Sequence, residues 1–374
     1  MDFQPVEKFL EHILAERVPG YDCIIMKQNE QVFRKTDGDL KRDSIFNLYS
    51  ATKVITCTAA LQLFEQGRFL LTDPVSDYIP EFKNMQLRVT REDGTTGLVP
   101  AKNPIRIRDL FTMSAGLTYD LQYPSILRVR EETQGRCPTV ETVRAIAGEP
   151  LIFEPGAHWA YSLCHDVLGA LVEVVSGQRF GEYLKEHIFA PLGMKDTGFY
   201  LNAEQKKRLA NQYQFSDELK KPELITQVNQ FRLGSEYESG GAGLYSCAED
   251  YALFAAAMAN GGTDKNGTYI LGRNTIDLMR ANHLSSEALK DFNWTQMAGY
   301  GYGLGVRTMM DKAAGGALSS LGEFGWGGAA GCYVMIDPDR QIGVFYAQHM
   351  LNNQEPYIHP RLRNLVYTCL DKHA

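Results

Sequence analysis

Hydrophobic positions repeat with a helical period in several segments and form strand-like runs near both ends of the chain. Residues 5–16 carry apolar side chains at helical spacing, and Pro19-Gly20 stops that helix. Two short β-rich runs follow at residues 23–26 and 31–33, with polar residues 28–30 between them. This pattern predicts a helix followed by a β-hairpin.

The middle of the chain is dominated by helical patterns. Residues 51–66 are dense in Ala, Leu, Ile and Val and apolar on nearly every side, which predicts a buried helix that Gly67 ends. Residues 72–108 contain several prolines and are expected to be irregular. Further helices are predicted over residues 108–114, 139–146, 165–176, 182–188, 248–260 and 275–282.

The last third of the chain turns to strand composition. Strands are predicted over residues 302–308, 330–336 and 343–348, with a turn at 337–340 and a final helix over about 356–370. Strand patterns therefore lie near both chain ends, and helices lie between them. This order predicts an α+β fold in which one antiparallel sheet, built from both chain ends and flanked by helices, receives an inserted all-helical region.

Length and composition fit an ordinary globular protein. The chain has 374 residues, of which 44% are hydrophobic and 22% charged. We expect residues 1–374 to form a single unit, with an α/β part at about 1–70 and 290–374 and a mostly helical part at about 71–289. The formal net charge of -7 makes nucleic acid an unfavourable partner, because an acidic surface repels phosphate backbones.

The sequence also bears on localisation and cysteine chemistry. Residues 1–10 lack a basic start followed by an apolar run, so they do not indicate a secretory signal, although a signal removed beforehand would leave the same sequence. No run of residues approaches the roughly 20 apolar positions of a membrane span. The seven cysteines are scattered without a C-x-x-C pair, which favours reduced thiols in a cytoplasmic protein and implies no metal. No organic cofactor is implied either.

The first candidate for chemistry is Ser50-Ala51-Thr52-Lys53, at the start of the predicted buried helix. A serine hydroxyl is a weak nucleophile until a nearby base takes its proton, and residues three apart on a helix lie on one face. The positive end of the helix dipole favours an oxyanion at the same place, and burial favours the neutral amine form of a lysine. By itself the tetrapeptide also fits a serine N-cap followed by a solvated lysine.

Two further segments carry groups that fit such chemistry. Tyr161 follows a Pro-Gly turn and stands between His158 and His165, so it could relay a proton or be a packed aromatic residue. Trp326-Gly327-Gly328-Ala329 leads into a predicted strand, and its glycines would let a substrate approach the strand edge closely. A glycine-rich start of a hairpin would have the same composition.

Together these three segments resemble those of the serine β-lactamase and penicillin-binding-protein superfamily. The closest resemblance is to class C β-lactamase-related proteins and family VIII carboxylesterases. It extends from about residue 18 to about residue 350 and includes family-like phrases at residues 107–117, 191–194 and 239–244, in the expected order. An ordered set of this kind is far more specific than the tetrapeptide alone.

The resemblance implies a mechanism through an acyl-enzyme. Ser50 would be the acylated nucleophile and Lys53 its hydrogen-bonded base. Tyr161, at the first position of the family's Tyr-x-Asn motif, would carry a proton to the leaving group and from the deacylating water. The backbone N–H groups of Ser50 and Ala329 would form the oxyanion hole, and the Trp326-Gly327-Gly328 segment stands where lactamases have Lys-Thr-Gly.

Two departures from the family pattern bear on the substrate. Leu163 occupies the position of the family's asparagine, and Trp326-Gly327 replaces Lys-Thr. We expect Leu163 and residues 326–328 to contact substrate. Without a cation or hydroxyl there, the site lacks charge-assisted hydrogen bonds, worth roughly 1.5–3 kcal/mol each, that would hold the carboxylate of a β-lactam. The departures therefore favour esters with small uncharged acyl groups over penicillins.

Several alternatives stay open at this point. The same acyl-enzyme would serve an acyltransferase, a D-amino-acid peptidase or amidase, or a weak β-lactamase. A non-catalytic binding protein could keep the fold, although the presence of Ser50, Lys53 and Tyr161 argues against it. A Ser-His-Asp arrangement through His165 and Asp166 is disfavoured because Lys53 already supplies a base. The expected partner is a small acyl substrate, with no nucleic acid and no membrane; the sequence does not determine the oligomeric state.

Overall fold

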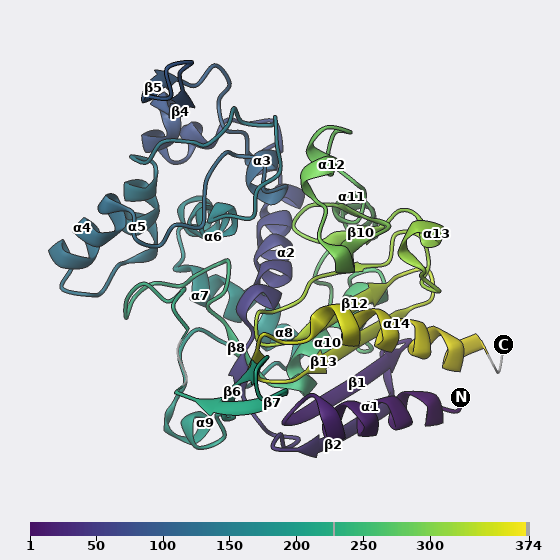
Figure 1. The fold of residues 1–374 in the computed structure, drawn as a ribbon. Coiled ribbons are helices and arrows are strands. Elements are labelled where there is room, and N and C mark those ends of the chain that lie inside the picture. Colours follow the sequence, from purple (N-terminus) through teal and green to yellow (C-terminus); the bar gives the residue numbers. More distant parts are fainter. Residues whose placement is uncertain (227–228, 372–374) are drawn as a thin grey trace.

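The computed structural model describes residues 1–226 and 229–371, and its centre is a seven-stranded antiparallel sheet (Figure 1). In spatial order the strands are β2 (Glu30–Gly38), β1 (Gly20–Lys27), β13 (Ile342–Ala347), β12 (Tyr333–Asp337), β11 (Phe324–Gly325), β10 (Arg307–Met309) and β9 (Tyr300–Tyr302). The register places Cys23 of β1 opposite Tyr346 of β13. The N-terminal hairpin therefore pairs directly with the C-terminal strands, which confirms the prediction of one antiparallel sheet built from both chain ends.

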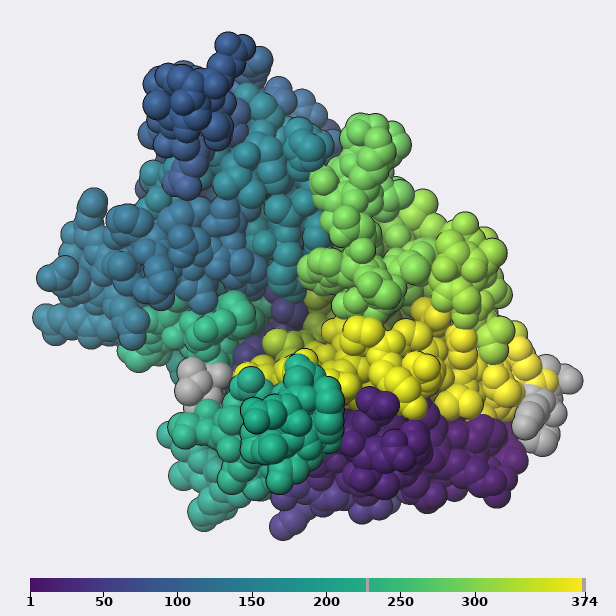
Figure 2. Space-filling view, viewed as in Figure 1, coloured from purple at the N-terminus to yellow at the C-terminus, as the bar shows by residue number. Residues whose placement is uncertain are grey.

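The two faces of this sheet are covered by different helices. Gln28 and Asn29, with φ of 54° and 62°, form the tight turn of the β1–β2 hairpin. Successive residues of β1 point to opposite faces, so Ile25 packs toward α1 (Gln4–Glu16) and α14 (Glu355–Asp371), whereas Ile24 belongs to the core on the other side. Figure 2 shows α14 in yellow lying against the N-terminal segment in purple.

The second face of the sheet packs on α10 (Ala248–Ala259). A Cβ on Gly343 of β13 would lie 2.7 Å from the Ala255 carbonyl carbon, so glycine is required for this close approach. The remaining α-helices are α2 (Thr52–Glu65), α3 (Ile107–Phe111), α4 (Pro124–Glu132), α5 (Thr139–Ile146), α6 (Cys164–Ser176), α7 (Phe180–Leu184), α8 (Ala190–Leu192), α9 (Ala203–Lys207), α11 (Arg273–Met279), α12 (Ala288–Asp291) and α13 (Lys312–Gly315). Among the described helices none is long and apolar enough to cross a membrane.

Short strands that the sequence patterns did not predict lie outside the central sheet, some in the inserted region and some in the chain on either side of it. They are β3 (Phe46–Asn47) paired with β8 (Tyr245–Ser246), β4 (Gln86–Thr90) paired with β5 (Thr96–Pro100), and β6 (Gln212–Ser216) between β7 (Lys221–Ile225) and β14 (Met350–Leu351). The β4–β5 hairpin corrects the expectation that residues 72–108 are irregular. The four prolines at positions 74, 80, 100 and 104 outweighed two hairpin signals: the polar–apolar alternation of Gln86–Thr90 and the Asp93-Gly94 turn.

A second correction concerns residues 302–308, predicted as one strand. The chain reverses there, so that β9 and β10 are two antiparallel strands. The Gly303 N–H donates to the Val306 carbonyl at 2.7 Å, and Gly305 has a φ of +82°, which favours glycine. The two glycines inside this short apolar run therefore indicate a tight turn between two strands.

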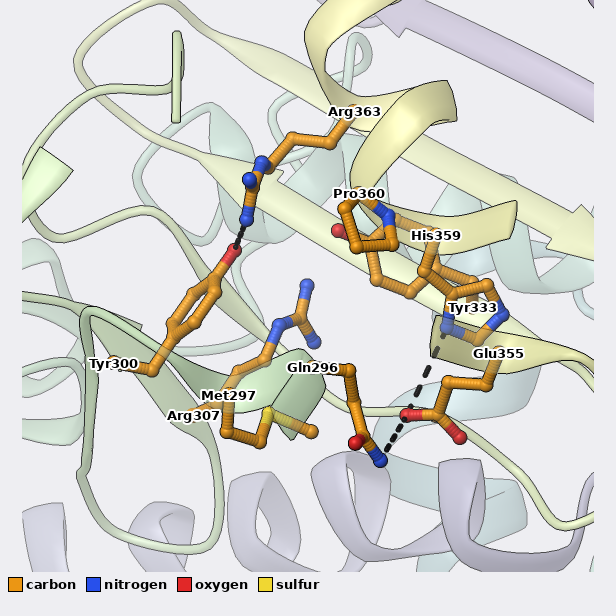
Figure 3. Close-up of a pocket in the computed structure, with 10 residues that line it drawn as sticks. Gln296, Met297, Tyr300, Arg307, Tyr333, Glu355, His359, Pro360 and Arg363 are labelled. Atoms are coloured by element: carbon orange, nitrogen blue, oxygen red, sulfur yellow. Dashed lines mark hydrogen bonds and ion pairs between the residues drawn. The ribbon is translucent and has the colours of Figure 1, made fainter. Parts of the chain in front are cut away.

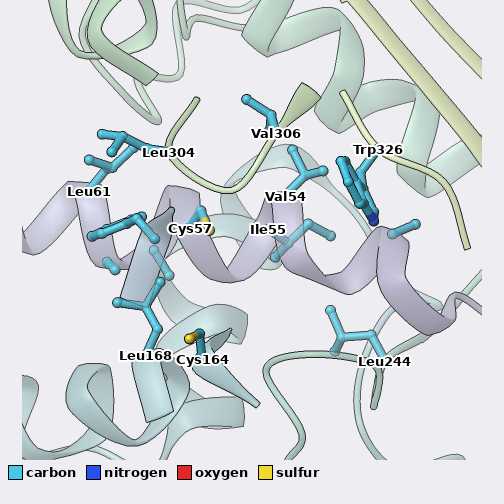
Figure 4. Packing of buried hydrophobic residues seen from close by; sticks show 14 of the residues in the cluster. Val54, Ile55, Cys57, Leu61, Cys164, Leu168, Leu244, Leu304, Val306 and Trp326 are labelled. Carbon is cyan, nitrogen blue, oxygen red and sulfur yellow. The ribbon is translucent and has the colours of Figure 1, made fainter. Parts of the chain in front are cut away.

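Helix α2 lies at the centre of the molecule, as its composition predicted. Its residues 52–61 are all buried. Figure 4 shows Cys164 and Leu168 of α6 on one side of this helix and Leu304, Val306 and Trp326 on the other. Because α2 is enclosed on all sides, the groups at its N-terminus have little freedom to move.

Candidate active site

Ser50 lies in a strained turn that leads into α2. Tyr49 has a φ of +47°, a left-handed conformation that costs a non-glycine residue roughly 1–2 kcal/mol. Its buried ring is anchored by a 2.6 Å hydrogen bond from Gln212 Nε2 to the Tyr49 hydroxyl. Ser50 follows in the 3₁₀ turn η1 (Tyr49–Ala51), so its hydroxyl and N–H lie at the positive end of the α2 dipole.

Lys53 lies one helical turn after Ser50 and is completely buried. Its side-chain nitrogen, Nζ, donates to Ser50 Oγ at 3.1 Å, to the Tyr119 hydroxyl at 3.2 Å and to the Gly241 carbonyl oxygen at 2.6 Å. These three neutral oxygens match the three donors of an ammonium group. The lysine is therefore held in one position, within hydrogen-bond reach of the serine hydroxyl.

The loop that supplies the Gly241 carbonyl approaches α6 so closely that only glycine fits. A Cβ on Gly240 would lie 2.3 Å from the His165 carbonyl oxygen. A Cβ on Gly241 would lie 2.6 Å from Asp166 Oδ2. Asp166 also accepts a 2.6 Å hydrogen bond from Ser239 Oγ, so its carboxylate anchors this loop against α6. The family-like phrase at residues 239–244 thus positions an acceptor for Lys53.

Tyr161 faces the same space from the segment that precedes α6. Lys53 Nζ lies 4.6 Å from the centroid of its ring, and Trp326 Nε1 donates to its hydroxyl at 3.2 Å. The Tyr161 and Trp326 rings are stacked, with centroids 5.9 Å apart and planes inclined by 17°. The fold thus brings together Ser50, Lys53, Tyr161 and Trp326 from distant parts of the sequence.

The segment from Trp326 to Ala329 connects β11 with β12 and touches the chain just ahead of Ser50. A Cβ on Gly328 would lie 2.2 Å from the Leu48 carbonyl oxygen, so this close approach needs glycine. The turn at residues 328–331 is closed by a 2.8 Å backbone hydrogen bond between its first and last residues. The N–H of Ala329, at the second position, takes no part in that bond.

A cavity of about 160 Å³ opens beside Ser50. Tyr161 and the whole segment from Trp326 to Ala329 line it, as the resemblance led us to expect. Three other side chains line it too: Trp294, Met297 and Glu355. Three of the cavity's nine lining residues are aromatic, and one carries a carboxyl group. No lysine or arginine is among the lining residues in the described part of the chain.

Leu163, expected to contact substrate, does not line this cavity. Its side chain is only 2% exposed and belongs to the central core, and its N–H donates to the Thr118 carbonyl at 3.1 Å. The residue that replaces the family's asparagine therefore serves packing at the start of α6. The expectation rested on a motif position, and the direction of the side chain was not visible in the sequence.

The sequence did not single out Tyr119, Trp294, Met297 or Glu355. Tyr119 stands two positions after the family-like segment at residues 107–117, so its place next to that segment is the one sequence signal that points to it. Burial raises the pKa of Tyr119 well above that of an ordinary tyrosine, so its hydroxyl stays neutral beside Lys53. Trp294 and Glu355 carry no local signal, because neither belongs to a recognisable motif.

The structure does not assemble a Ser-His-Asp relay. Burial lowers the pKa of His165 to about 3, and its Nε2 lies 3.1 Å from the Phe111 carbonyl oxygen. Its neighbour Asp166 accepts a hydrogen bond from the Ser239 hydroxyl. Both side chains therefore hold α6 and the adjoining loop in place, and neither is hydrogen-bonded to Ser50.

Other reactive groups lie outside the cavity. All seven cysteines are buried. Burial raises the pKa of Cys57 and of Cys332, which keeps both thiols protonated. Within residues 1–226 and 229–371, no group of three or more His, Cys, Asp or Glu side chains is arranged to hold a metal ion.

Comparison with known proteins places the chain in a family. The model of the β-lactamase family matches residues 6–367, so the chain belongs to that family, and it is a serine hydrolase. Esterase EstB of Burkholderia gladioli is 29% identical over 367 residues, which cover 90% of this chain and 86% of that protein. Acyltransferase calJ of Penicillium decumbens is 25% identical over 366 residues, covering 94% of this chain and 84% of that one.

The solved structures support the same fold. EstCE1, described as a hydrolase with promiscuous acyltransferase activity, superposes with a TM-score of 0.79 at 26% identity and covers 97% of this chain and 98% of its own. The β-lactamase/transpeptidase-like fold expected from the sequence is thereby confirmed.

Proposed function

We propose that this chain is a carboxylesterase that acts on small esters with uncharged acyl groups through an acyl-enzyme on Ser50. The observation that carries the proposal is the contact between Lys53 Nζ and Ser50 Oγ, 3.1 Å, at the edge of an aromatic cavity lined by no lysine or arginine of the described chain. The similarity to a protein named as an esterase, EstB, supports it.

Acylation begins when Lys53 acts in its neutral form. A neutral amine has two N–H donors and one lone pair. The Gly241 carbonyl and the Tyr119 hydroxyl accept the two N–H groups, which leaves the lone pair facing Ser50 Oγ. As Oγ adds to the ester carbonyl carbon, the serine proton moves to Lys53. The backbone N–H groups of Ser50 and Ala329 stabilise the oxyanion.

Collapse of this intermediate breaks the bond between the carbonyl carbon and the alcohol oxygen. Tyr161 gives its hydroxyl proton to the departing alcohol and regains one from Lys53, and the acyl group stays on Ser50. A water molecule then attacks the acyl-enzyme and gives up a proton through the same groups in reverse order. Ser50 regains its proton as the acid is released. The 3.2 Å hydrogen bond from Trp326 Nε1 to the Tyr161 oxygen supports this role, because it stabilises the transient phenolate.

The residues of the cavity wall favour esters over β-lactams as substrates. A penicillin needs a cation or hydroxyl for its carboxylate, and the segment from Trp326 to Ala329 offers an indole and two glycines instead. That wall also carries the carboxyl group of Glu355, which in its ionised form would repel a carboxylate. A neutral ester has no such requirement.

A second candidate function is acyl transfer to an alcohol in place of water. One observation favours it: Tyr119, which contacts Lys53, also lines a cavity of about 500 Å³ with Arg130, Asn229 and Arg232 among others, and this cavity would accommodate an acceptor molecule. EstCE1 is described as having promiscuous acyltransferase activity, and calJ is named as an acyltransferase. Adding an alcohol to a p-nitrophenyl butyrate assay and measuring the butyrate ester formed against free butyrate would separate the two functions.

The test of the proposed function is covalent labelling combined with turnover. The wild-type protein should hydrolyse p-nitrophenyl acetate and butyrate, and a fluorophosphonate probe should add a single mass increment. Peptide mapping should place the adduct on Ser50, and the Ser50→Ala variant should remain unlabelled. Labelling at another residue, or ester turnover with an unlabelled Ser50, would contradict the proposal. The Ser176→Ala variant, at the end of α6, is the matched control and should be labelled like wild type.

A further inference from the structure

Glu355, the first residue of α14, lies in the wall between two cavities. One is the cavity beside Ser50, and the other is a smaller one behind it, lined also by Arg307 and His359 (Figure 3). The side chain of Glu355 is 20% exposed, and residues Met297 and Gly327 share the dividing wall with it. A Cβ on Gly327 would lie 3.7 Å from Glu355 Oε1. The carboxyl group is therefore next to the position where lactamases carry Lys-Thr.

The groups that contact this carboxyl are neutral. Gln296 Nε2 donates to Glu355 Oε1 at 3.4 Å, and His359 Nδ1 lies 3.8 Å from the same oxygen. His359 brings no charge near neutral pH, because burial lowers its pKa to about 3. Among the described residues, the direct contacts of Glu355 therefore do not include a cation.

Two arginines, Arg307 and Arg363, line the smaller cavity together with Glu355, and in the described chain neither is hydrogen-bonded to its carboxyl group. Arg307 donates through Nη2 to Glu323 Oε1 at 3.0 Å, and both side chains are almost completely buried, whereas its Nη1 has no hydrogen-bond partner among the residues that the structure describes. Arg363 donates to the Tyr300 hydroxyl at 2.9 Å, as Figure 3 shows. Burial raises the pKa of Glu355, and the hydrogen bond from Gln296 and the charge of Arg307 only partly oppose that rise. A carboxylate at this place is short of positive charge, which a ligand could supply.

The other walls of the cavity also suit a cation. Trp294, Trp326 and Tyr161 surround the same space, and aromatic ring faces attract ammonium groups, quaternary ones included. The formal net charge of -7 draws cations toward the protein and repels anions.

We propose that Glu355 is a specificity-determining residue that binds an ammonium group on the alcohol half of the ester. The inference rests on the proposed esterase function. In a β-lactam the carboxylate is attached to the carbon next to the ring nitrogen, which is the leaving atom. The Lys-Thr position therefore corresponds to the leaving-group half of an ester, and the acyl half stays uncharged.

The experiment compares two isosteric pairs of esters by kcat/KM. The first pair puts the charge on the alcohol half: butyrylcholine against 3,3-dimethylbutyl butyrate, in which carbon replaces the quaternary nitrogen. The second puts it on the acyl half: the p-nitrophenyl esters of 4-trimethylammoniobutyrate and 5,5-dimethylhexanoate. Wild type should prefer butyrylcholine about tenfold or more, the ratio that 1.4 kcal/mol gives, and should not prefer the cation in the second pair.

The matched variants are Glu355→Gln, which removes the charge and keeps the shape, and Glu204→Gln on the exposed helix α9. Glu355→Gln should bring the butyrylcholine ratio to within about twofold of unity, and Glu204→Gln should keep the wild-type ratio. A ratio near unity in wild type, a ratio that survives Glu355→Gln, or a preference confined to the acyl pair overturns the inference.

A measurement on wild type alone keeps the inference testable if Glu355→Gln does not fold. Choline should inhibit the hydrolysis of p-nitrophenyl butyrate at a concentration about tenfold lower than 3,3-dimethylbutan-1-ol does. Equal inhibition by the two alcohols overturns the inference and leaves the esterase function standing. Absence of turnover with every neutral ester, together with an unlabelled Ser50, removes both.

Discussion

The two walls of the cavity beside Ser50 differ in how their polar groups are satisfied. On the α2 side, Lys53 contacts three oxygen acceptors. Only glycine fits at position 241, because Asp166 lies too close for a Cβ. On the opposite side, Trp294 and Trp326 line the cavity together with a Glu355 carboxyl whose direct contacts are neutral. Lys53 Nζ has three oxygen acceptors within the protein, whereas a cationic partner for Glu355 would have to come from a ligand. A substitution in the first wall should therefore slow all esters, whereas one in the second should change which ester is preferred.

The largest effect is expected for Ser50→Ala. If the α2 wall performs the chemistry, removing its nucleophile should lower kcat for p-nitrophenyl butyrate by at least about 10³-fold. Circular dichroism and the thermal midpoint should match wild type, because Ser50 is only partly buried. Retention of normal turnover by a folded Ser50→Ala protein would place the chemistry elsewhere in the molecule.

The next effect concerns the proton carriers on the same side. Lys53→Ala and Tyr161→Phe should each lower kcat by roughly 100-fold or more, as expected for general acid–base groups. His165→Ala should lower the thermal midpoint by removing a core side chain but should leave kcat of the folded protein within about an order of magnitude. The opposite order, with a mild Lys53→Ala and a crippling His165→Ala or Asp166→Ala, would show that the base is misassigned.

The aromatic wall is tested by substrate choice. Losing about two charge-assisted contacts at roughly 1.5–3 kcal/mol each implies a penalty on the order of 100-fold or more for a carboxylated β-lactam relative to a true lactamase. Nitrocefin should therefore react far more slowly in kcat/KM than p-nitrophenyl acetate or butyrate on one preparation. Nitrocefin turnover equal to that of an antibiotic-resistance β-lactamase would mean that a cation from another loop holds the carboxylate. That result would leave the mechanism through Ser50 unaffected.

The smallest effect separates two tyrosines that both lie near Lys53. Tyr119→Phe removes one of three acceptors from Lys53 Nζ, a loss of about 1 kcal/mol, so kcat should fall by roughly fivefold. Tyr161→Phe in the same assay should fall much further. Equal losses would mean that the proton carrier is Tyr119, or that the two phenols share the step.

Much of the architecture was predictable because it depends on local pattern. Helical spacing predicted α1, α2, α5 and α10 to within a few residues, since amphipathic or wholly apolar periodicity needs no knowledge of the partner. The prediction was wrong where a tertiary feature overrode composition. Glycines divided the expected strand at residues 302–308, and the prolines on either side of the β4–β5 hairpin outweighed the alternation of Leu87 and Val89 with polar residues.

The sequence by itself determined that Ser50 and Lys53 meet, because residues three apart on a helix share a face whatever surrounds the helix. It also indicated the segments around Tyr161 and Trp326. Only the tertiary structure decided that Tyr119 and Gly241 hold Lys53, that Leu163 turns into the core, and that Trp294 and Glu355 complete the cavity wall. These side chains reach the site through packing between segments distant in sequence, and no local spacing encodes which of two buried directions a side chain takes.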